Sequence, residues 1–306
     1  MTEFRNLEIG FTVAIGLAFA AGLVFGSFLN VCRVRMAAGE NIAWPGSHCP
    51  RCGCALRWWQ NVPLVSWIAL RGRCASCREG ISALYPLYEL SIGLLWAGLA
   101  AGAITGLSEA ALPSMGQLMG AVGMAVFCWL LVLLAALDAE HLWLPDAVTL
   151  PAIGLGLVYR LSLAWYAPQP VGPAAGALLR LAGLPDSPVA AVLLYGFAAL
   201  AGAGLVLTIR LVYWLVRRRE GMGLGDAKLM AALGAWLGPG AALDAFFAAV
   251  LAATLAALVW LGWHRSSREK WAAMPLPLGT FLAVAALLEV FRPEWLWSAW
   301  SGLFLR

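Results

Sequence analysis

The chain has 306 residues, of which 62% are hydrophobic and 12% are charged, and its formal net charge is +4. Its mean hydropathy of +0.82 excludes a disordered protein and an ordinary soluble domain. This composition predicts an all-α polytopic membrane protein, because lipid offers no hydrogen-bonding partner to unpaired backbone groups.

Apolar runs predict about eight transmembrane helices along the chain. We place them at residues 9–31, 84–105, 116–137, 145–165, 188–214, 225–238, 241–263 and 275–291. The sixth run is short for a crossing, so we expect it to borrow residues from the glycine-rich turns on either side. We do not expect the first run to be a signal peptide, because no basic segment precedes it and no small-residue cleavage site follows it.

The basic residues are distributed unevenly between the two sides of this topology. Fourteen of the twenty Lys and Arg residues fall on one side, counting Lys228 at the start of the sixth run; four fall on the other side, and two lie deeper within predicted spans. The excess of positive charge on cytoplasmic loops then places residues 32–83 in the cytoplasm and both termini in the periplasm. The arginines are scattered over loops rather than clustered, so we expect no nucleic-acid partner.

These features divide the chain into three parts. Residues 1–31 form a first transmembrane helix, residues 32–83 a cytoplasmic domain, and residues 84–306 a larger membrane domain. The segment 166–187 is rich in proline and glycine and is predicted to be an outer loop with a short surface helix at 174–183.

Four cysteines in the cytoplasmic domain have the spacing of a metal site. Cys49 and Cys52 form one C-x2-C pair, and Cys74 and Cys77 form a second. Two such pairs are typical of a structural tetrathiolate zinc site, in which each pair carries two thiolates to one face of a tetrahedron. Cytoplasmic placement argues against disulfides, and a redox C-x-x-C pair is the alternative.

The other cysteines are outside this pattern. Cys54 lies beside the predicted zinc site without a role that the sequence defines, and His48 is an alternative ligand there. Cys32 and Cys128 are expected to be ordinary residues of the membrane border and the core.

Asp138 directly follows the third apolar run, at the end where the helix dipole disfavours a negative charge. An ionisable side chain at membrane depth is costly and is by default a candidate for function. The alternative is an interfacial carboxylate that only reaches water.

Asp146 follows Leu144 and Pro145 and is the first residue of the next predicted helix. Two roles are open for it, a helix cap and a supporting role near the site.

Asp226 lies in the stretch GMGLGDAK at residues 221–228. Gly223 and Gly225 allow a tight turn and close approach of another chain segment. Asp226 alone is compatible with a helix cap. However, the topology brings Asp138 and Asp226 to the same border of neighbouring spans. Lys228 is two positions beyond Asp226, so it is expected to point elsewhere, towards lipid phosphate or substrate.

Two carboxylates at one apolar border cannot both ionise easily, so one is expected to keep a proton. An aspartic protease needs this arrangement, with one carboxylate as the base for water and the other as the acid at the scissile carbonyl. The helix ends favour an ionised Asp226 and a protonated Asp138.

With these residues the chain resembles the type IV prepilin peptidases, which are leader peptidases and N-methyltransferases of pilus and type II secretion systems. The resemblance runs over nearly the whole chain and rests on these segments: GSFLNV (26–31), CPRCG (49–53), WQNVPLVSW (59–67), RGRCASC (71–77), YPLYEL (85–90), LDAEHLWLPDAVTLP (137–151) and GMGLGDAKLMAALGAWLG (221–238).

The resemblance implies that Asp138 and Asp226 are the catalytic pair of a membrane aspartyl protease and that the four cysteines bind zinc. It implies prepilin and pseudopilin substrates, cleavage on the cytoplasmic side of the bacterial inner membrane, and methylation of the new N-terminus with S-adenosylmethionine. Three alternatives remain from the residues, namely a transporter with intramembrane carboxylates, a zinc-ribbon scaffold, and a peptidase for another helical membrane substrate.

Overall fold

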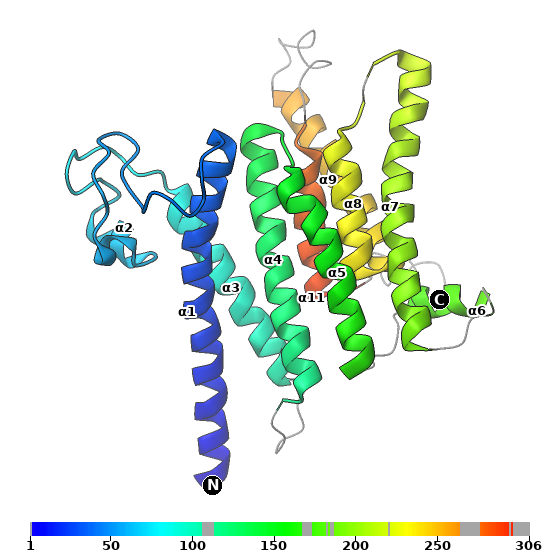
Figure 1. Cartoon of the computed structure of the whole chain (residues 1–306), viewed down its shortest axis with the longest axis horizontal. Helices are drawn as coiled ribbons and strands as arrows, with labels where there is room; N and C mark the ends of the chain where they lie inside the picture. The colour runs from blue at the N-terminus through cyan, green and yellow to red at the C-terminus, as the bar shows by residue number, and fades with distance from the viewer. Residues whose placement is uncertain are drawn as a thin grey trace. The chain divides into compact units, whose positions relative to one another are not determined.

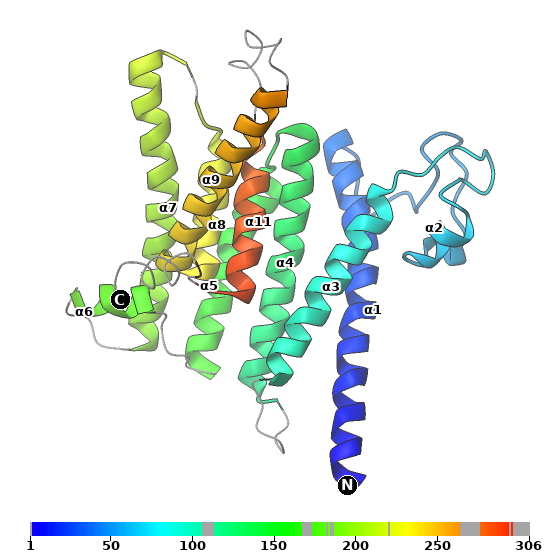
Figure 2. The same cartoon turned by 180° about the vertical axis from the view of Figure 1, so that it is seen from behind.

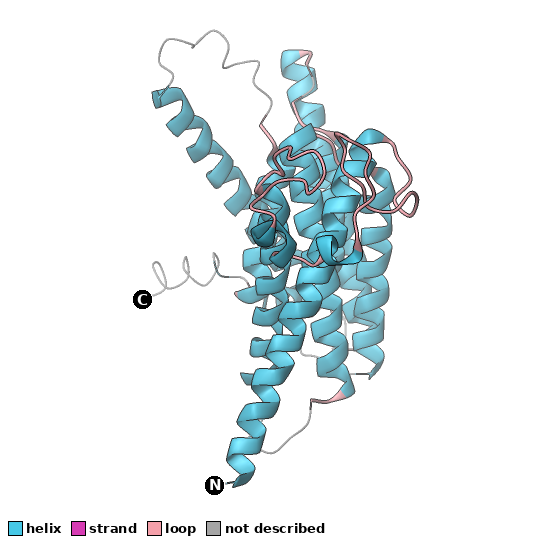
Figure 3. Cartoon of the chain, turned by 90° about the vertical axis from the view of Figure 1, so that its left-hand side faces the viewer, coloured by secondary structure: helices cyan, strands magenta, loops and turns pink. Residues whose placement is uncertain are grey.

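The computed structural model describes residues 2–105, 113–166, 173–181, 183, 187–219, 221–263, 276–293 and 295. Every regular element among them is a helix, and their β-type pairing is limited to two isolated antiparallel bridges, so Figure 3 contains helices and loops only. The predicted all-α class is confirmed.

The helices follow one another along the chain as coloured in Figure 1. They are α1 (Thr2–Ala38), the 3-10 helix η1 (Trp58–Asn61), α2 (Val65–Ala69), α3 (Leu84–Thr105), α4 (Met115–His141), α5 (Asp146–Tyr166), α6 (Pro173–Leu181), α7 (Pro188–Arg217), α8 (Leu224–Leu237), α9 (Pro239–Trp263) and α11 (Leu278–Phe291).

Six described helices are long and apolar enough to cross a membrane. They are α1 from Ile9 onwards, α3, α4, α5, α7 and α9. These helices match six of the predicted spans. Helix α1 continues through residue 31 to Ala38, so the predicted boundary between a membrane helix and a cytoplasmic domain falls inside a continuous helix.

The other two predicted spans correspond to shorter helices. Helices α8 and α11 have 14 residues each. A helix of that length extends for about 21 Å, which is less than the ~30 Å hydrocarbon core of a bilayer. Helix α8 begins at Leu224 and stops at Leu237, without the residues that we expected it to borrow from the flanking turns. The predicted count of eight spans is therefore not confirmed.

Residues 167–172, 182 and 184–186 of the predicted outer loop at 166–187 lie outside the described residues. Within it, the structure describes the end of α5 and helix α6, which corresponds to the short surface helix expected at 174–183.

The chain forms two compact units, residues 1–133 and 134–306, with the boundary inside α4. In the first unit, α1 and α3 pack along each other, as both Figure 1 and Figure 2 show. The contact is close because Gly26 has no side chain: a Cβ atom there would lie 2.5 Å from the Cα atom of Glu89.

In the second unit, α8 is the central helix. It contacts α5, α7, α9 and α11, and Figure 2 shows these helices side by side. Helix α8 is buried from Leu229 to Trp236. A Cβ atom at Gly234 would lie 2.4 Å from the carbonyl oxygen of Ala198 on α7, so glycine is required for this close approach.

The C-terminal end of α8 is held by two polar side chains from α5 and α8. Arg160 donates to the carbonyl oxygen of Trp236 through Nε at 2.8 Å and also through Nη2. The indole N–H of Trp236 donates to the carbonyl oxygen of Ala152 at 2.7 Å. A positive charge at a helix C-terminus is favourable, and together these bonds fix α8 along its axis against α5.

Candidate active site and metal centre

Asp138 lies in the last turn of α4, and it is buried, with 6% of its surface exposed. Its carboxylate is held by Thr280, the third residue of α11. The backbone N–H of Thr280 donates to Oδ2 at 2.6 Å, and the Thr280 hydroxyl lies 3.1 Å from the same oxygen. The buried carboxylate therefore has hydrogen-bond partners from a helix that begins 140 residues further along the chain.

Asp226 is the third residue of α8, and Gly223 precedes the helix as its N-cap. The Gly223 N–H donates to Oδ2 of Asp226 at 3.1 Å, which is the backbone half of a capping box. The capping role that the sequence left open is thus present, and it orients the Asp226 side chain.

Leu144 packs between the two aspartate-bearing segments. A Cβ atom at Gly225 would lie 2.9 Å from Leu144 Cβ, and one at Gly279 would lie 3.0 Å from Leu144 Cδ1 and 3.0 Å from Asp138 Cγ. Larger residues at either glycine would push Leu144 or Asp138 away. The ends of α4, α8 and α11 therefore converge on one apolar contact, with the carboxylates at its edge.

The two carboxylates interact electrostatically. Burial, together with the negative charge of Asp138, raises the pKa of Asp226 to about 6. The single hydrogen bond from Gly223 offsets only part of this effect. Asp226 belongs to α8, which is not one of the six long spanning helices.

The hydrogen-bond donors around the pair are unequal. Asp138 accepts the N–H of Thr280 and lies within reach of its hydroxyl, whereas Asp226 accepts one backbone N–H. Donors stabilise an ionised carboxylate. The donors therefore stabilise an anion more at Asp138 than at Asp226, whereas the helix dipoles act in the opposite sense.

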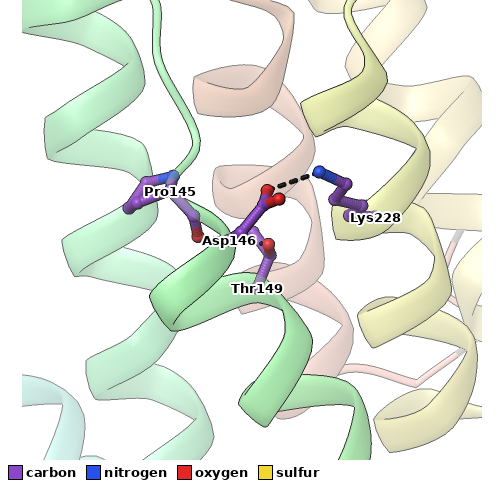
Figure 4. Close-up of polar contacts among 4 residues, drawn as sticks. All are labelled: Pro145, Asp146, Thr149 and Lys228. Carbon is purple, nitrogen blue, oxygen red and sulfur yellow. Dashed lines mark hydrogen bonds and ion pairs between the residues drawn. The ribbon is translucent and has the colours of Figure 1, made fainter.

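Asp146 and Lys228 form an ion pair between the first turns of α5 and α8 (Figure 4). Asp146 is the first residue of α5, and the carbonyl oxygen of Pro145 accepts the hydroxyl of Thr149 at 3.1 Å beside it. The partner of Lys228 in the structure is therefore Asp146, a carboxylate of this chain. The expected contact of Lys228 with lipid phosphate or substrate stays a prediction.

Sequence reasoning missed Thr280. Threonine is a common residue, and neither its position after a proline-rich stretch nor its distance from Asp138 in the chain pointed to the aspartates. The one signal in the sequence is the succession Pro277-Leu278-Gly279, which is typical of a helix start. The structure adds the reason for Gly279, because a side chain there would meet Asp138 and Leu144.

The four predicted metal-binding cysteines come together in the segment between α1 and α3. Their Sγ atoms all lie within 4.8 Å of one another, and those of Cys49 and Cys77 are 3.9 Å apart. This set of thiols can hold a metal ion.

The two C-x2-C turns have the same backbone pattern. Cys49 N–H donates to the carbonyl oxygen of Cys54 at 3.0 Å, and Cys74 N–H donates to that of Glu79 at 2.8 Å. The fifth residue of each turn, Gly53 or Arg78, has a positive φ. Backbone N–H groups of Cys77 and Ser76 lower the pKa of Cys74 to about 6, whereas the pKa values of Cys52 and Cys77, beside the other thiols, are raised.

The remaining candidates lie outside this cluster. Cys54 is exposed and accepts a hydrogen bond from the Ser76 hydroxyl at 3.3 Å. The His48 ring nitrogen Nδ1 lies 3.0 Å from the carbonyl oxygen of Gly46. Cys32 and Cys128 are buried within α1 and α4.

Taken together, the described residues define a polytopic membrane protein with two carboxylates at converging helix ends and a cluster of four cysteine thiols. Two family models match it, the bacterial peptidase A24 N-terminal domain over residues 20–102 and the type IV leader peptidase family over residues 125–258. No solved structure matches the chain.

Several curated proteins are similar over most of their length, and each is named prepilin leader peptidase/N-methyltransferase. One from Burkholderia pseudomallei strain 1026b is 36% identical over 95% of this chain and 89% of its own. Another from Neisseria gonorrhoeae is 34% identical over 83% of this chain and 85% of its own. A third, from Klebsiella pneumoniae, is 37% identical over 72% of this chain and 83% of its own. The chain belongs to the type IV leader peptidase family.

The Asp146–Lys228 pair predicts a measurable coupling between α5 and α8. Reversing one charge, in Asp146→Lys or Lys228→Asp, should lower the thermal unfolding temperature in detergent, because two like charges then face each other. Reversing both charges in one variant should restore most of the lost unfolding temperature, because the two side chains again have opposite charges. We expect a coupling of about 0.2–1 kcal/mol, since the Asp146 side chain is 62% exposed and solvent screens the pair. Additive effects in the double variant would show that the pair does not join the two helices.

Proposed function

We propose that this protein cleaves the basic leader from type IV prepilins and pseudopilins at the cytoplasmic face of the inner membrane and then N-methylates the new N-terminal residue. The observation that carries the peptidase is the convergence of two carboxylate-bearing helix ends on Leu144: Asp138 is buried at the end of α4, and Asp226 lies in the first turn of α8. The second activity follows the names of the relatives, which combine both reactions.

The topology proposed from the basic residues suits this reaction. In this topology, three segments lie on the cytoplasmic side: residues 32–83, the connection between α7 and α8, and the connection between α9 and α11. Both termini are then periplasmic. Asp138 and Asp226 then lie at the cytoplasmic border. A prepilin has a positively charged leader in the cytoplasm and an apolar helix in the bilayer, so its cleavage site falls at this same border.

In the proposed mechanism, Asp138 is the general base and Asp226 is the general acid. Asp138, stabilised as the anion by Thr280, accepts a proton from a water molecule that attacks the scissile carbonyl carbon. Asp226 donates its proton to the carbonyl oxygen as the tetrahedral intermediate forms. The protons belong to the pair, so when the C–N bond breaks one carboxyl group protonates the departing amine.

Thr280 is proposed as a positioning residue for both proton states of Asp138. Its hydroxyl lies 3.1 Å from Asp138 Oδ2 and also 3.1 Å from the carbonyl oxygen of Ala135. The hydroxyl has one proton, which it can donate to an ionised Asp138. When Asp138 carries a proton, the hydroxyl can accept it in a hydrogen bond and donate its own proton to Ala135. The carboxylate therefore keeps a partner throughout the cycle.

Zinc is the proposed occupant of the cysteine cluster. Tetrahedral zinc with Zn–S bonds of about 2.3 Å separates its sulfur ligands by about 3.8 Å. The 3.9 Å between Cys49 and Cys77 fits that geometry. Four protein thiolates would leave no open coordination position, so the metal would stabilise the fold of the segment and take no part in peptide cleavage.

Methylation would use S-adenosylmethionine, which supplies an electrophilic methyl group to the new amine. The acceptor would be the free amine, which forms when the new N-terminal ammonium group loses a proton.

A transporter with an intramembrane carboxylate path is not favoured. Such proteins hold their ionisable groups near the middle of the bilayer, whereas Asp138 and Asp226 lie at the ends of their helices. The family to which the chain belongs is one of peptidases.

The dyad predicts loss of cleavage in Asp138→Asn and in Asp226→Asn. Each variant should lower the rate by at least about a thousandfold, within the range expected for loss of a general acid or base. The purified protein is incubated in detergent with a prepilin, with and without S-adenosylmethionine, and the products are identified by intact mass. Loss of the leader establishes the peptidase, and a further methyl group establishes the second reaction. Full activity in either variant would contradict the dyad.

This assignment also predicts the direction of the pH dependence. Asp226 acts in its protonated form, so kcat/KM should decline as the pH rises through its pKa. That pKa is raised to about 6, and a surrounding bilayer would raise it further. We expect the midpoint of the alkaline limb at or above about pH 6.

Thr280→Val should lower kcat about tenfold and leave KM nearly unchanged, because it removes one hydrogen bond to a charged group and keeps the backbone N–H. Thr280→Ser should restore the rate, since it keeps the hydroxyl. In an Asp138→Asn background, Thr280→Val should have no further effect. Equal loss in the Val and Ser variants would indicate packing and not the hydroxyl.

The zinc site predicts one zinc ion per chain by elemental mass spectrometry. Replacing Cys74 and Cys77 with serine should remove it, whereas Cys54→Ser should not, because Cys54 lies outside the four-thiol cluster. Retention of a full equivalent after loss of two ligands would refute the site.

A further inference from the structure

The segment between α1 and α3 exposes apolar side chains on its short helix α2. Val65 is 62% exposed and Ile68 is 68% exposed. Residues three apart lie on the same face of a helix, so these two form one apolar face. In the 3-10 helix that precedes it, Trp58 is 83% exposed. None of these side chains belongs to the thiol cluster or to the aspartate pair.

Helix α2 is tethered to a membrane-spanning helix. The N–H of Leu64, directly before α2, donates to Oε2 of Glu89 at 2.8 Å. Glu89 is the sixth residue of α3, so it lies about 8 Å along that helix from its first residue. It is buried, at 7% exposure, and belongs to the apolar stretch Leu84–Ile104 of α3, which is long enough to cross a membrane. The start of α2 is thus fixed beside the first turns of a helix that crosses the membrane.

A second bond fixes the rotation of α2. The indole N–H of Trp67 donates to the carbonyl oxygen of Ile81 at 3.1 Å, three residues before α3 begins. With Trp67 turned towards the chain that leads into α3, Val65 and Ile68 face outwards. In Figure 1, α2 lies below the level at which α1 ends, alongside the two spanning helices of its own unit.

The neighbouring side chains of α3 continue this apolar surface towards lipid. Leu87, Leu90 and Leu94 are 53%, 37% and 58% exposed. They follow one another at helical spacing on a predicted membrane span and therefore face acyl chains. Val65 and Ile68 lie at the depth where this lipid-facing surface begins.

The charges next to α2 complement an anionic membrane surface. Arg57 precedes η1, and Arg71 and Arg73 follow α2 after Leu70; all three are exposed. The cytoplasmic leaflet of a bacterial membrane carries anionic headgroups, and basic residues near an interface are attracted to them. Trp58 has the amphipathic side chain that is typical of the interfacial layer.

We propose that α2 is a membrane-inserted anchor: Val65 and Ile68 lie among the acyl chains of the cytoplasmic leaflet, and Arg57, Arg71 and Arg73 bind anionic headgroups. The metal-binding segment is then held on the bilayer at both its ends and through α2 in its middle. This inference does not depend on the proposed peptidase or methyltransferase activity.

The test uses the full-length protein in vesicles of phosphatidylcholine and phosphatidylglycerol. A fluorescent amino acid is incorporated in place of Ile68 or, as a control, in place of Ala43, which is exposed in the loop that follows α1. Lipids with a nitroxide near the headgroup end of the acyl chain then quench probes at that depth. We expect quenching at position 68 to exceed that at position 43 by at least threefold.

Equal quenching at the two positions would overturn the proposal, whether position 68 faces water or is covered by protein. Stronger quenching at position 68 that appears only when a prepilin is added would also overturn it, because the position of α2 would then depend on substrate and not on the protein alone. For the headgroup contacts, Arg57→Gln with Arg71→Gln should reduce quenching at position 68 in vesicles with phosphatidylglycerol. Unchanged quenching in that variant would refute the role of the arginines.

Zinc content serves as the control for folding in each variant. One zinc ion per chain with altered quenching would show that α2 has moved relative to lipid while the thiol cluster remains intact. A milder variant, Ile68→Ser, should increase amide hydrogen exchange across residues 64–70 severalfold in vesicles. Exchange that is unchanged from the wild type would contradict burial of this face in lipid.

Discussion

The hydrogen bonds from Thr280 to Asp138 join the end of α4 to the start of α11 within the second unit. A carboxylate at the end of an apolar helix is unfavourable unless donors reach it, and here the donors come from the first turn of α11. This requirement brings α11 against the end of α4. It also explains Gly279, because a side chain there would occupy the space of the Asp138 carboxylate.

Asp226 is held by a different set of constraints, and these act on α8 as a whole. Gly223 orients its side chain, and the Asp146–Lys228 pair ties the first turn of α8 to α5. At the other end, Arg160 binds the carbonyl oxygen of Trp236, so the same two helices are joined twice. A 14-residue helix joined at both ends has little freedom to slide or rotate. Its first turn, with Asp226, is positioned by contacts far from the carboxylate itself.

Composition and periodicity predicted the helical class and the six long spans, because the length of an apolar run directly reflects the thickness of a bilayer. They did not determine the lengths of α8 and α11. A short apolar run can be a buried core helix or a crossing, and the choice depends on neighbours that the sequence does not identify. The cysteine cluster was predictable from spacing alone, since each C-x2-C pair closes its own turn through local backbone bonds.

The aspartate site was predictable only in part, for a related reason. Asp138 and Asp226 stand out because charge is rare in apolar surroundings, but Thr280 has no such contrast. The proton distribution reasoned from helix dipoles also differs from the one that the hydrogen bonds favour. A dipole acts through partial charges at a helix end and is weakened by solvent, whereas two direct donors on a buried oxygen act at 2.6–3.1 Å. We therefore expect local donors to outweigh the dipole at Asp138. They come from α11, so a property of this carboxylate is set by a segment that sequence proximity does not reveal.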